Sequence, residues 1–346
     1  MKRWLIGLTL SLSLFSISFF DEARVFPVDG KTSLADVIET LEGKPNPNRP
    51  DISGGEISAQ KGKELFFTGT TQEPGSFFDT RRISKFFTCD ACHNSVREDP
   101  DISNLNPEDR LEFAIENNIP FLPGTTFFGV VNRESYYNGD YFKKYGQLVY
   151  PARESLRESI QLCATECSQG RRLEPWEVES IVAYFWELEI EMEDLELSSE
   201  EMELVENALA SGVGNELSNS ALTMLKSKYP LKSPATFLDP PGTREERIHV
   251  TGDPIKGEHL FDASCQYCHY DNNFSYFLLN ESKMTMKYLY RHLADYDIQS
   301  VYQVARYGTP PKSGKRAYMP QYTEERMSKS QMVDLITFIR REAGKL

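Results

Sequence analysis

The sequence predicts a mainly α-helical protein that contains two tandem copies of one small helical domain. Three observations predict this class: a five-residue motif that occurs twice, a short helix pattern before each copy and a longer helix pattern after it. The chain has 346 residues, which is long enough for two compact domains. Its formal net charge of −14 argues against nucleic acid or an anionic membrane surface as a partner.

The repeated motif is Cys-x-x-Cys-His, at residues 89–93 and 265–269. It is the attachment signature of c-type haem, in which two thiols add to the porphyrin vinyl groups and the histidine binds the iron. A zinc site needs four ligands, and a redox dithiol needs no histidine. Two complete copies therefore predict two covalently bound haem c groups, each enclosed by one cytochrome c-like domain. The attachment residues are Cys89, Cys92, Cys265 and Cys268, and the proximal ligands are His93 and His269.

Helix patterns flank both motifs. The sequence Gly-x-x-Leu-Phe, at residues 62–66 and 257–261, matches the short first helix of a cytochrome c. The last helices are expected over residues 173–186 and 327–340, where apolar residues follow a helix start at a spacing of 3.6. Gly62 and Gly257 suit positions where the first and last helices cross so closely that a Cβ has no room.

The N-terminal segment Met1–Arg3, with the basic residues Lys2 and Arg3, and the apolar run Trp4–Phe20 are typical of a secretory leader. This run is short and serine-rich for a membrane span. We therefore expect a periplasmic protein, which touches the membrane only if the leader stays as an uncleaved anchor. The predicted division is a signal peptide or anchor (1–20), an arm or linker (21–55), a first cytochrome c domain (56–190), an acidic helical connector (191–250) and a second cytochrome c domain (251–346).

Two shorter helices are expected outside the haem domains. A helical pattern lies near residues 33–41 in the arm. In the connector, Ser198 and Glu201 form the sequence pattern of a capping box, which predicts a helix that begins after Ser198.

Met319 is the expected sixth ligand of the second haem, because Tyr318-Met319-Pro320 precedes the last helix where a cytochrome c presents its distal methionine. A thioether favours ferrous iron and raises the reduction potential. Ligation by His269 and Met319 predicts an electron-transfer haem.

The first domain has no histidine or methionine after His93 until Met192, and aligning the last helices places Thr165 opposite Met319. Cys163 and Cys167 lie on either side of Thr165. A cysteine thiolate is a strong ligand for ferric haem, so either cysteine is a candidate ligand or catalytic residue. The alternatives are a disulfide between the two, or an open site faced by Tyr136, Tyr137 or water.

The sequence resembles the thiosulfate dehydrogenase family of dihaem cytochromes and, more distantly, the SoxA-type cytochromes. The similar residues are Ile160-Gln161-Leu162-Cys163, Gly170, Leu173 and the helix segment 177–184. The resemblance implies that Cys163 is the distal ligand of a catalytic haem, and that the second haem is a relay. Residues 125–139 are weakly similar to a loop of dihaem peroxidases, but Asn138 stands where that family has a histidine.

The leading functional hypothesis is an oxidoreductase that acts on a small sulfur anion at the first haem and passes electrons through the second haem to or from a small redox cytochrome. The protein is acidic, so a sulfur anion needs local cations. The candidates near Cys163 are Arg153, Arg157, Arg171 and Arg172. The alternatives are a pure electron-transfer cytochrome of a respiratory chain and, less favoured, a dihaem peroxidase.

Overall fold

The computed structural model describes residues 27–270, 273–275, 277–293, 300–309 and 319–346. These residues form helices and three isolated β-bridges, with no β-strand among them, so the predicted mainly α class is confirmed. The predicted leader and Tyr318 lie outside the described residues. None of the described helices is long and apolar enough to cross a membrane.

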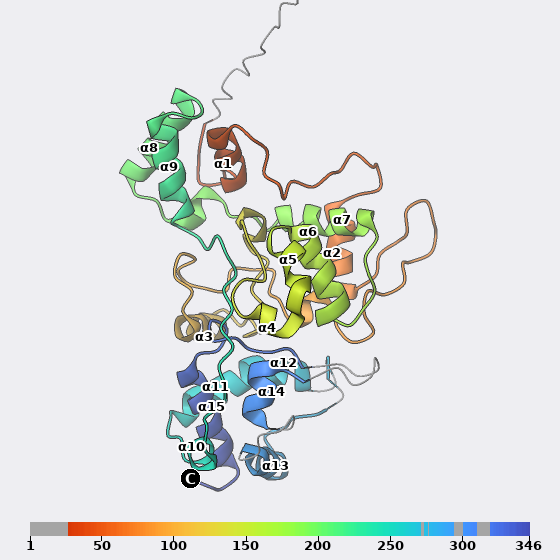
Figure 1. The fold of residues 1–346 in the computed structure, drawn as a ribbon, viewed down its shortest axis with the longest axis vertical. Coiled ribbons are helices and arrows are strands. Elements are labelled where there is room, and N and C mark those ends of the chain that lie inside the picture. Colours follow the sequence, from red (N-terminus) through yellow and green to blue (C-terminus); the bar gives the residue numbers. More distant parts are fainter. Residues whose placement is uncertain (1–26, 271–272, 276, 294–299, 310–318) are drawn as a thin grey trace, which may run out of the picture.

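The first Cys-x-x-Cys-His motif belongs to a helical unit in the middle of Figure 1. Its core is formed mainly by α2 (Ala59–Thr68), α6 (Leu156–Leu162) and α7 (Pro175–Trp186), with Phe66 and Ile181 among the buried residues. The motif itself begins with a short turn, η1 (Cys89–Ala91). Helix α7 begins with Pro175 in its first turn, where a proline is tolerated.

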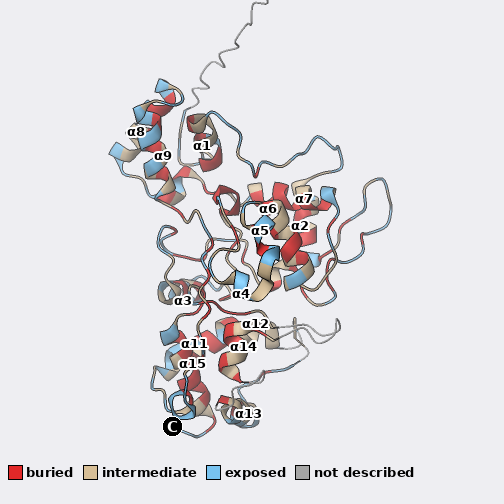
Figure 2. Ribbon diagram, in the orientation of Figure 1, coloured by how far each residue is buried: buried red, intermediate tan, exposed pale blue. Residues whose placement is uncertain are grey.

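The second motif belongs to a unit at the bottom of Figure 1. The helices of this unit are α11 (Pro254–Leu260), α12 (Gln266–His269), α13 (Lys283–Leu293), α14 (Val301–Tyr307) and α15 (Lys329–Glu342). One segment of the N-terminal half joins this core, because Leu111 and Ala114 of α3 (Pro107–Glu116) and Phe121 pack into it. The two halves of the chain therefore share a buried boundary (Figure 2).

The first and last helices of each unit cross with their backbones in contact, which confirms the prediction for both glycines. A Cβ on Gly62 in α2 would lie 1.9 Å from the carbonyl oxygen of Ser180 in α7. A Cβ on Gly257 in α11 would lie 2.1 Å from the carbonyl oxygen of Asp334 in α15. The two units thus repeat one packing relationship, as expected from their sequences.

A third core lies at the top of Figure 1, where α1 (Leu34–Glu42) packs against α8 (Ser199–Ser211) and α9 (Glu216–Lys226). Both helices predicted outside the haem domains are present, and α8 begins with the Ser198–Glu201 capping box. Segments assigned to the arm and to the connector therefore share buried apolar residues. The predicted domain boundaries themselves stay predictions.

The remaining elements are short. They are α4 (Tyr141–Tyr145), α5 (Val149–Arg153), α10 (Arg244–Ile248), the 3₁₀ turns η2 (Val130–Asn132), η3 (Gly146–Leu148) and η5 (Met192–Leu195), and the π-helical turns η4 (Cys163–Cys167) and η6 (Phe261–Cys265). Isolated π turns occur often at functional sites, and both π turns here end at a cysteine that the sequence analysis selected.

Candidate functional site

A large cavity in the first unit brings together the site residues predicted there. Cys89, Cys92, His93, Cys163 and Cys167 all line it. The wall of this cavity is mostly apolar. A flat, largely apolar tetrapyrrole therefore suits the character of this wall.

The ring of His93 is oriented for binding a metal. Its Nδ1 lies 2.7 Å from the carbonyl oxygen of Thr125. A carbonyl only accepts hydrogen bonds, so Nδ1 carries the proton and Nε2 keeps a free lone pair. Burial lowers the pKa of His93 to about 4, so the ring is neutral at neutral pH. Gly124 packs against this ring, and a Cβ there would come within 2.5 Å of it.

His269 has the same arrangement in the second unit. Its Nδ1 lies 2.5 Å from the carbonyl oxygen of Phe277, so Nδ1 donates and Nε2 is free. Burial lowers the pKa of His269 as well. Metal-binding histidines commonly donate their second ring N–H to a carbonyl or carboxylate, which fixes the tautomer and the ring direction. Both histidines therefore fit the role of a proximal ligand.

The paired thiols next to these histidines also fit covalent haem attachment. Cys89, Cys92, Cys265 and Cys268 are free and partly buried. Burial raises the pKa of Cys89 to about 12 and that of Cys265 to about 11, so both are neutral thiols at neutral pH. Cys89 and Cys92 share the cavity wall with His93, as the attachment of one porphyrin to all three residues requires.

Cys163 and Cys167 lie at the two ends of the π turn η4, and both thiols are free. The Tyr145 and Tyr137 hydroxyls lie 3.2 and 3.5 Å from Cys167 Sγ. A hydrogen bond from Cys163 and those from the two tyrosines lower the pKa of Cys167 to about 6 against the effect of burial, whereas the pKa of Cys163 is raised. The lowered pKa favours Cys167 over Cys163 as the thiolate of the pair, and the two cysteines form no disulfide in this structure.

Both tyrosines proposed for an open site line the cavity, but only one of them contacts a cysteine. The Tyr136 hydroxyl accepts a hydrogen bond from Asn48 at 2.9 Å and lies within hydrogen-bond distance of two main-chain carbonyls. Tyr137 instead packs against Tyr141 and Tyr145. The sulfur of Cys167 therefore lies beside a cluster of aromatic rings.

The arginines proposed as anion-binding residues do not line the cavity. Arg157 pairs with Glu179 at 2.6 Å, and Arg171 pairs with Glu177. Both ion pairs connect the segments that carry these arginines to α7. Arg172 is exposed beside Glu158, and Arg153 packs near the ring of Tyr150. Their closeness to Cys163 in the sequence therefore did not predict which arginines line the cavity.

Arg133, which was not predicted from the sequence, is the one arginine among the described residues that lines the cavity. Arg133 is buried, and its guanidinium donates to Ser233 Oγ at 3.1 Å and to the Thr126 carbonyl at 3.2 Å. Within the described residues, no carboxylate lies within 4.0 Å of it, and burial lowers its pKa. The only feature of the sequence that could have indicated Arg133 as a site residue is its position in the loop of residues 125–139.

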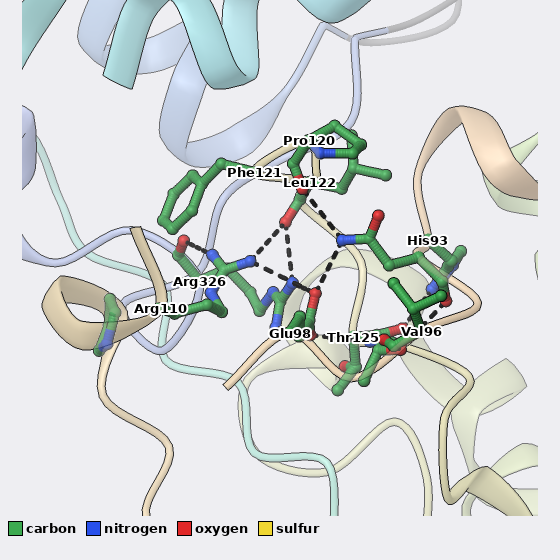
Figure 3. Close-up of polar contacts among 12 residues, drawn as sticks. His93, Val96, Glu98, Arg110, Pro120, Phe121, Leu122, Thr125 and Arg326 are labelled. Atoms are coloured by element: carbon green, nitrogen blue, oxygen red, sulfur yellow. Dashed lines mark hydrogen bonds and ion pairs between the residues drawn. The ribbon is translucent and has the colours of Figure 1, made fainter. Parts of the chain in front are cut away.

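A buried charge cluster lies behind His93 (Figure 3). Glu98 accepts hydrogen bonds from both terminal nitrogens of Arg326, at 2.5 and 2.9 Å. Arg110 lies 3.6 Å from the same carboxylate. Burial alone would raise the pKa of Glu98, but attraction to the two guanidiniums outweighs it and lowers the pKa. The sequence analysis missed this cluster, whose members are far apart in the chain.

Met319 is partly buried against the core of the second unit. Its backbone is held on both sides by Thr309, through hydrogen bonds of 2.7 and 3.1 Å. The next two residues, Pro320 and Gln321, line the cavity of the first unit. The segment that carries the expected sixth ligand of one haem therefore forms part of the wall around the other site.

Comparisons of the chain with protein-family models, with curated proteins and with solved structures found no match.

Proposed function

We propose that the protein is an exported dihaem c-type cytochrome that transfers electrons, with one haem bound at His93 and the other at His269. The observation that carries this proposal is the repeated geometry of the two histidines. Each lies next to a pair of free thiols, and each donates Nδ1 to a main-chain carbonyl so that Nε2 is left for iron.

Covalently bound haem would supply reversible one-electron chemistry at iron, at a potential set by the ligands and their surroundings. Residues of the chain itself would bind the haems and surround them. The wall around His93 is mostly apolar, and the carbonyls of Thr125 and Phe277 accept hydrogen bonds that orient the two imidazoles. The sulfur of Met319 would favour the ferrous state at the second site, which suits a relay.

The specific reaction proposed for the first site is oxidation or reduction of a small sulfur compound. Two features of the cavity support it. Cys167 is held as a thiolate beside Cys163, so a sulfur nucleophile or iron ligand is present at neutral pH. Arg133 places a buried guanidinium on the same wall, where it can attract an anion that the acidic surface would otherwise repel.

The main alternative is a pure electron carrier, in which the two cysteines only adjust the potential of the first haem. A peroxidase has less support. Asn138, which stands at the histidine position of the peroxidase loop, donates to Ser135 Oγ at 2.7 Å and accepts from the Ser233 amide at 3.1 Å. Its side chain is thus engaged in holding a turn.

The two leading functions can be separated with the purified haem-loaded protein. Thiosulfate or another small sulfur oxyanion should reduce the ferric haems, which is followed by visible absorption. The Cys163→Ala/Cys167→Ala double variant should keep both haems and lose this reaction. Absence of reduction, together with rapid electron exchange with a small cytochrome c, would favour the pure carrier.

A further inference from the structure

The ring of His93 is oriented by its hydrogen bond to the Thr125 carbonyl. The carboxylate of Glu98 binds the residue that follows each of these two partners. Its Oε2 accepts from the side-chain amide of Asn94, the residue after His93, at 3.0 Å. Its Oε1 accepts from the main-chain amide of Thr126, the residue after Thr125, also at 3.0 Å. The Thr126 hydroxyl in turn donates to the carbonyls of Asn94 and Val96. One carboxylate thus binds both the residue after the histidine and the residue after its carbonyl acceptor.

The partner that neutralises this carboxylate comes from the other half of the chain. Arg326 precedes α15 and donates to both oxygens of Glu98, as Figure 3 shows. Its Nη2 also donates to the Leu122 carbonyl at 3.0 Å, and Arg110 donates to the carbonyl of Arg326 itself. The side chains of Glu98 and Arg326 are at most 7 % exposed, so water does not replace either partner.

We propose that Glu98 and Arg326 are positioning residues that hold the His93 loop from both halves of the chain, so that the redox properties of a haem at His93 depend on docking of the C-terminal unit. This inference rests on the proposed dihaem function. Outer-shell partners of a ligating histidine are known to tune the metal that it binds. Here that outer shell is incomplete until residues 319–327 pack against the N-terminal unit.

The surrounding contacts agree with this dependence. Pro320 and Gln321, from the same C-terminal segment, line the His93 cavity, and Lys144 of α4 donates to the side-chain oxygen of Gln321. The Tyr322 hydroxyl donates to the Phe121 carbonyl at 3.0 Å. The segment is therefore anchored to the N-terminal unit at several points, and Arg326 is the one that reaches the carboxylate behind His93.

The test compares variants of the haem-loaded protein by redox titration and low-temperature paramagnetic resonance. Arg326→Lys keeps the charge but cannot make the two parallel hydrogen bonds. We expect it to shift the midpoint potential and the ferric signal of the His93 haem and to leave the His269 haem unchanged. Arg341→Lys is the matched control, because Arg341 pairs with Glu258 on the outside of the same unit. It should change neither haem.

Removal of one member of a buried ion pair can unfold a protein. The test therefore includes a second variant in which both charges are removed together. Glu98→Gln/Arg326→Gln removes both charges and should shift the His93 potential in a protein that still holds two haems. Wild-type potential and signal in both Arg326→Lys and this double variant would overturn the inference and leave the dihaem function intact. A wild-type protein that binds no haem would overturn both.

Discussion

The Tyr267 hydroxyl lies 3.2 Å from the main-chain oxygen of Asp90, to which it donates a hydrogen bond. Tyr267 lies inside the second Cys-x-x-Cys-His motif and Asp90 inside the first. Next to this contact, Cys268 Sγ lies 3.8 Å from the carbonyl oxygen of Ala91. The two Cys-x-x-Cys-His motifs therefore face each other across the boundary between the units, with one thiol of the second motif against the backbone of the first.

This contact predicts that Tyr267 supports electron exchange between the two haems. Tyr267→Phe removes one hydrogen bond, whose net contribution to stability is about 1 kcal/mol. We expect a slightly looser boundary, a lower unfolding midpoint and slower electron exchange between the haems after a rapid photoreduction pulse. Tyr270→Phe, at an exposed position three residues later, is the control. Equal exchange rates in the two variants would exclude the contact as part of the path.

The helix crossings predict that Gly62 and Gly257 are both essential for packing. Gly62→Ala and Gly257→Ala would each drive a Cβ into a carbonyl oxygen of the opposite helix. Overpacking of this kind costs about 1–3 kcal/mol. The cost should appear as a lower denaturant midpoint in equilibrium unfolding. Gly54→Ala, where an added Cβ meets only one methyl group at 3.5 Å, should be close to neutral; similar losses at all three positions would contradict the crossing geometry.

The sequence was sufficient for features that depend on local chemistry. The start of α8 follows from the capping pattern of Ser198 and Glu201, where neighbouring residues fix the geometry. The close crossing at Gly62 joins distant segments, and it was predicted because Gly-x-x-Leu-Phe matches the first helix of a cytochrome c. The association of Cys163 and Cys167 with the His93 cavity was also expected, from the correspondence of the last helices.

Features that depend on the relative placement of distant segments could not be predicted. Glu98 and Arg326 are 228 residues apart, and no periodicity or motif connects them. The arginines expected to bind an anion near Cys163 were predicted wrongly for a related reason. Arg157 and Arg171 are close to Cys163 in the sequence, yet each turns toward a glutamate of α7, while Arg133 reaches the cavity from a loop.

The hydrogen bonds to Cys167 predict a pH-dependent spectrum of the His93 haem. The pKa of Cys167 is lowered to about 6, so the thiolate is present above that pH and is lost on acidification. Iron coordination would lower this midpoint further. Tyr145→Phe removes a donor to the thiolate and should raise the midpoint in an absorption titration of the ferric protein. The exposed Tyr150→Phe should not, and a midpoint near the ordinary thiol value of about 8.5 would contradict the assignment.

The thiol pair also predicts a thiolate-bound ferric haem in paramagnetic resonance spectra. The family resemblance implies Cys163 as the ligand, whereas the hydrogen bonding of the free thiols favours the thiolate at Cys167. Replacement of both cysteines by alanine should remove the thiolate signal while both haems stay bound. The single variant that loses the signal identifies the ligand, and persistence of the signal in the double variant would disprove thiolate ligation by this pair.

The most direct test of the central claim is the intact mass of the denatured protein after expression in a bacterium that attaches haem c. Covalent bonds survive denaturation, so we predict the mass of the mature chain plus two haems. Cys89→Ala/Cys92→Ala and Cys265→Ala/Cys268→Ala should each carry one haem, and Cys163→Ala/Cys167→Ala should carry two. A wild-type mass equal to that of the bare chain would contradict the account.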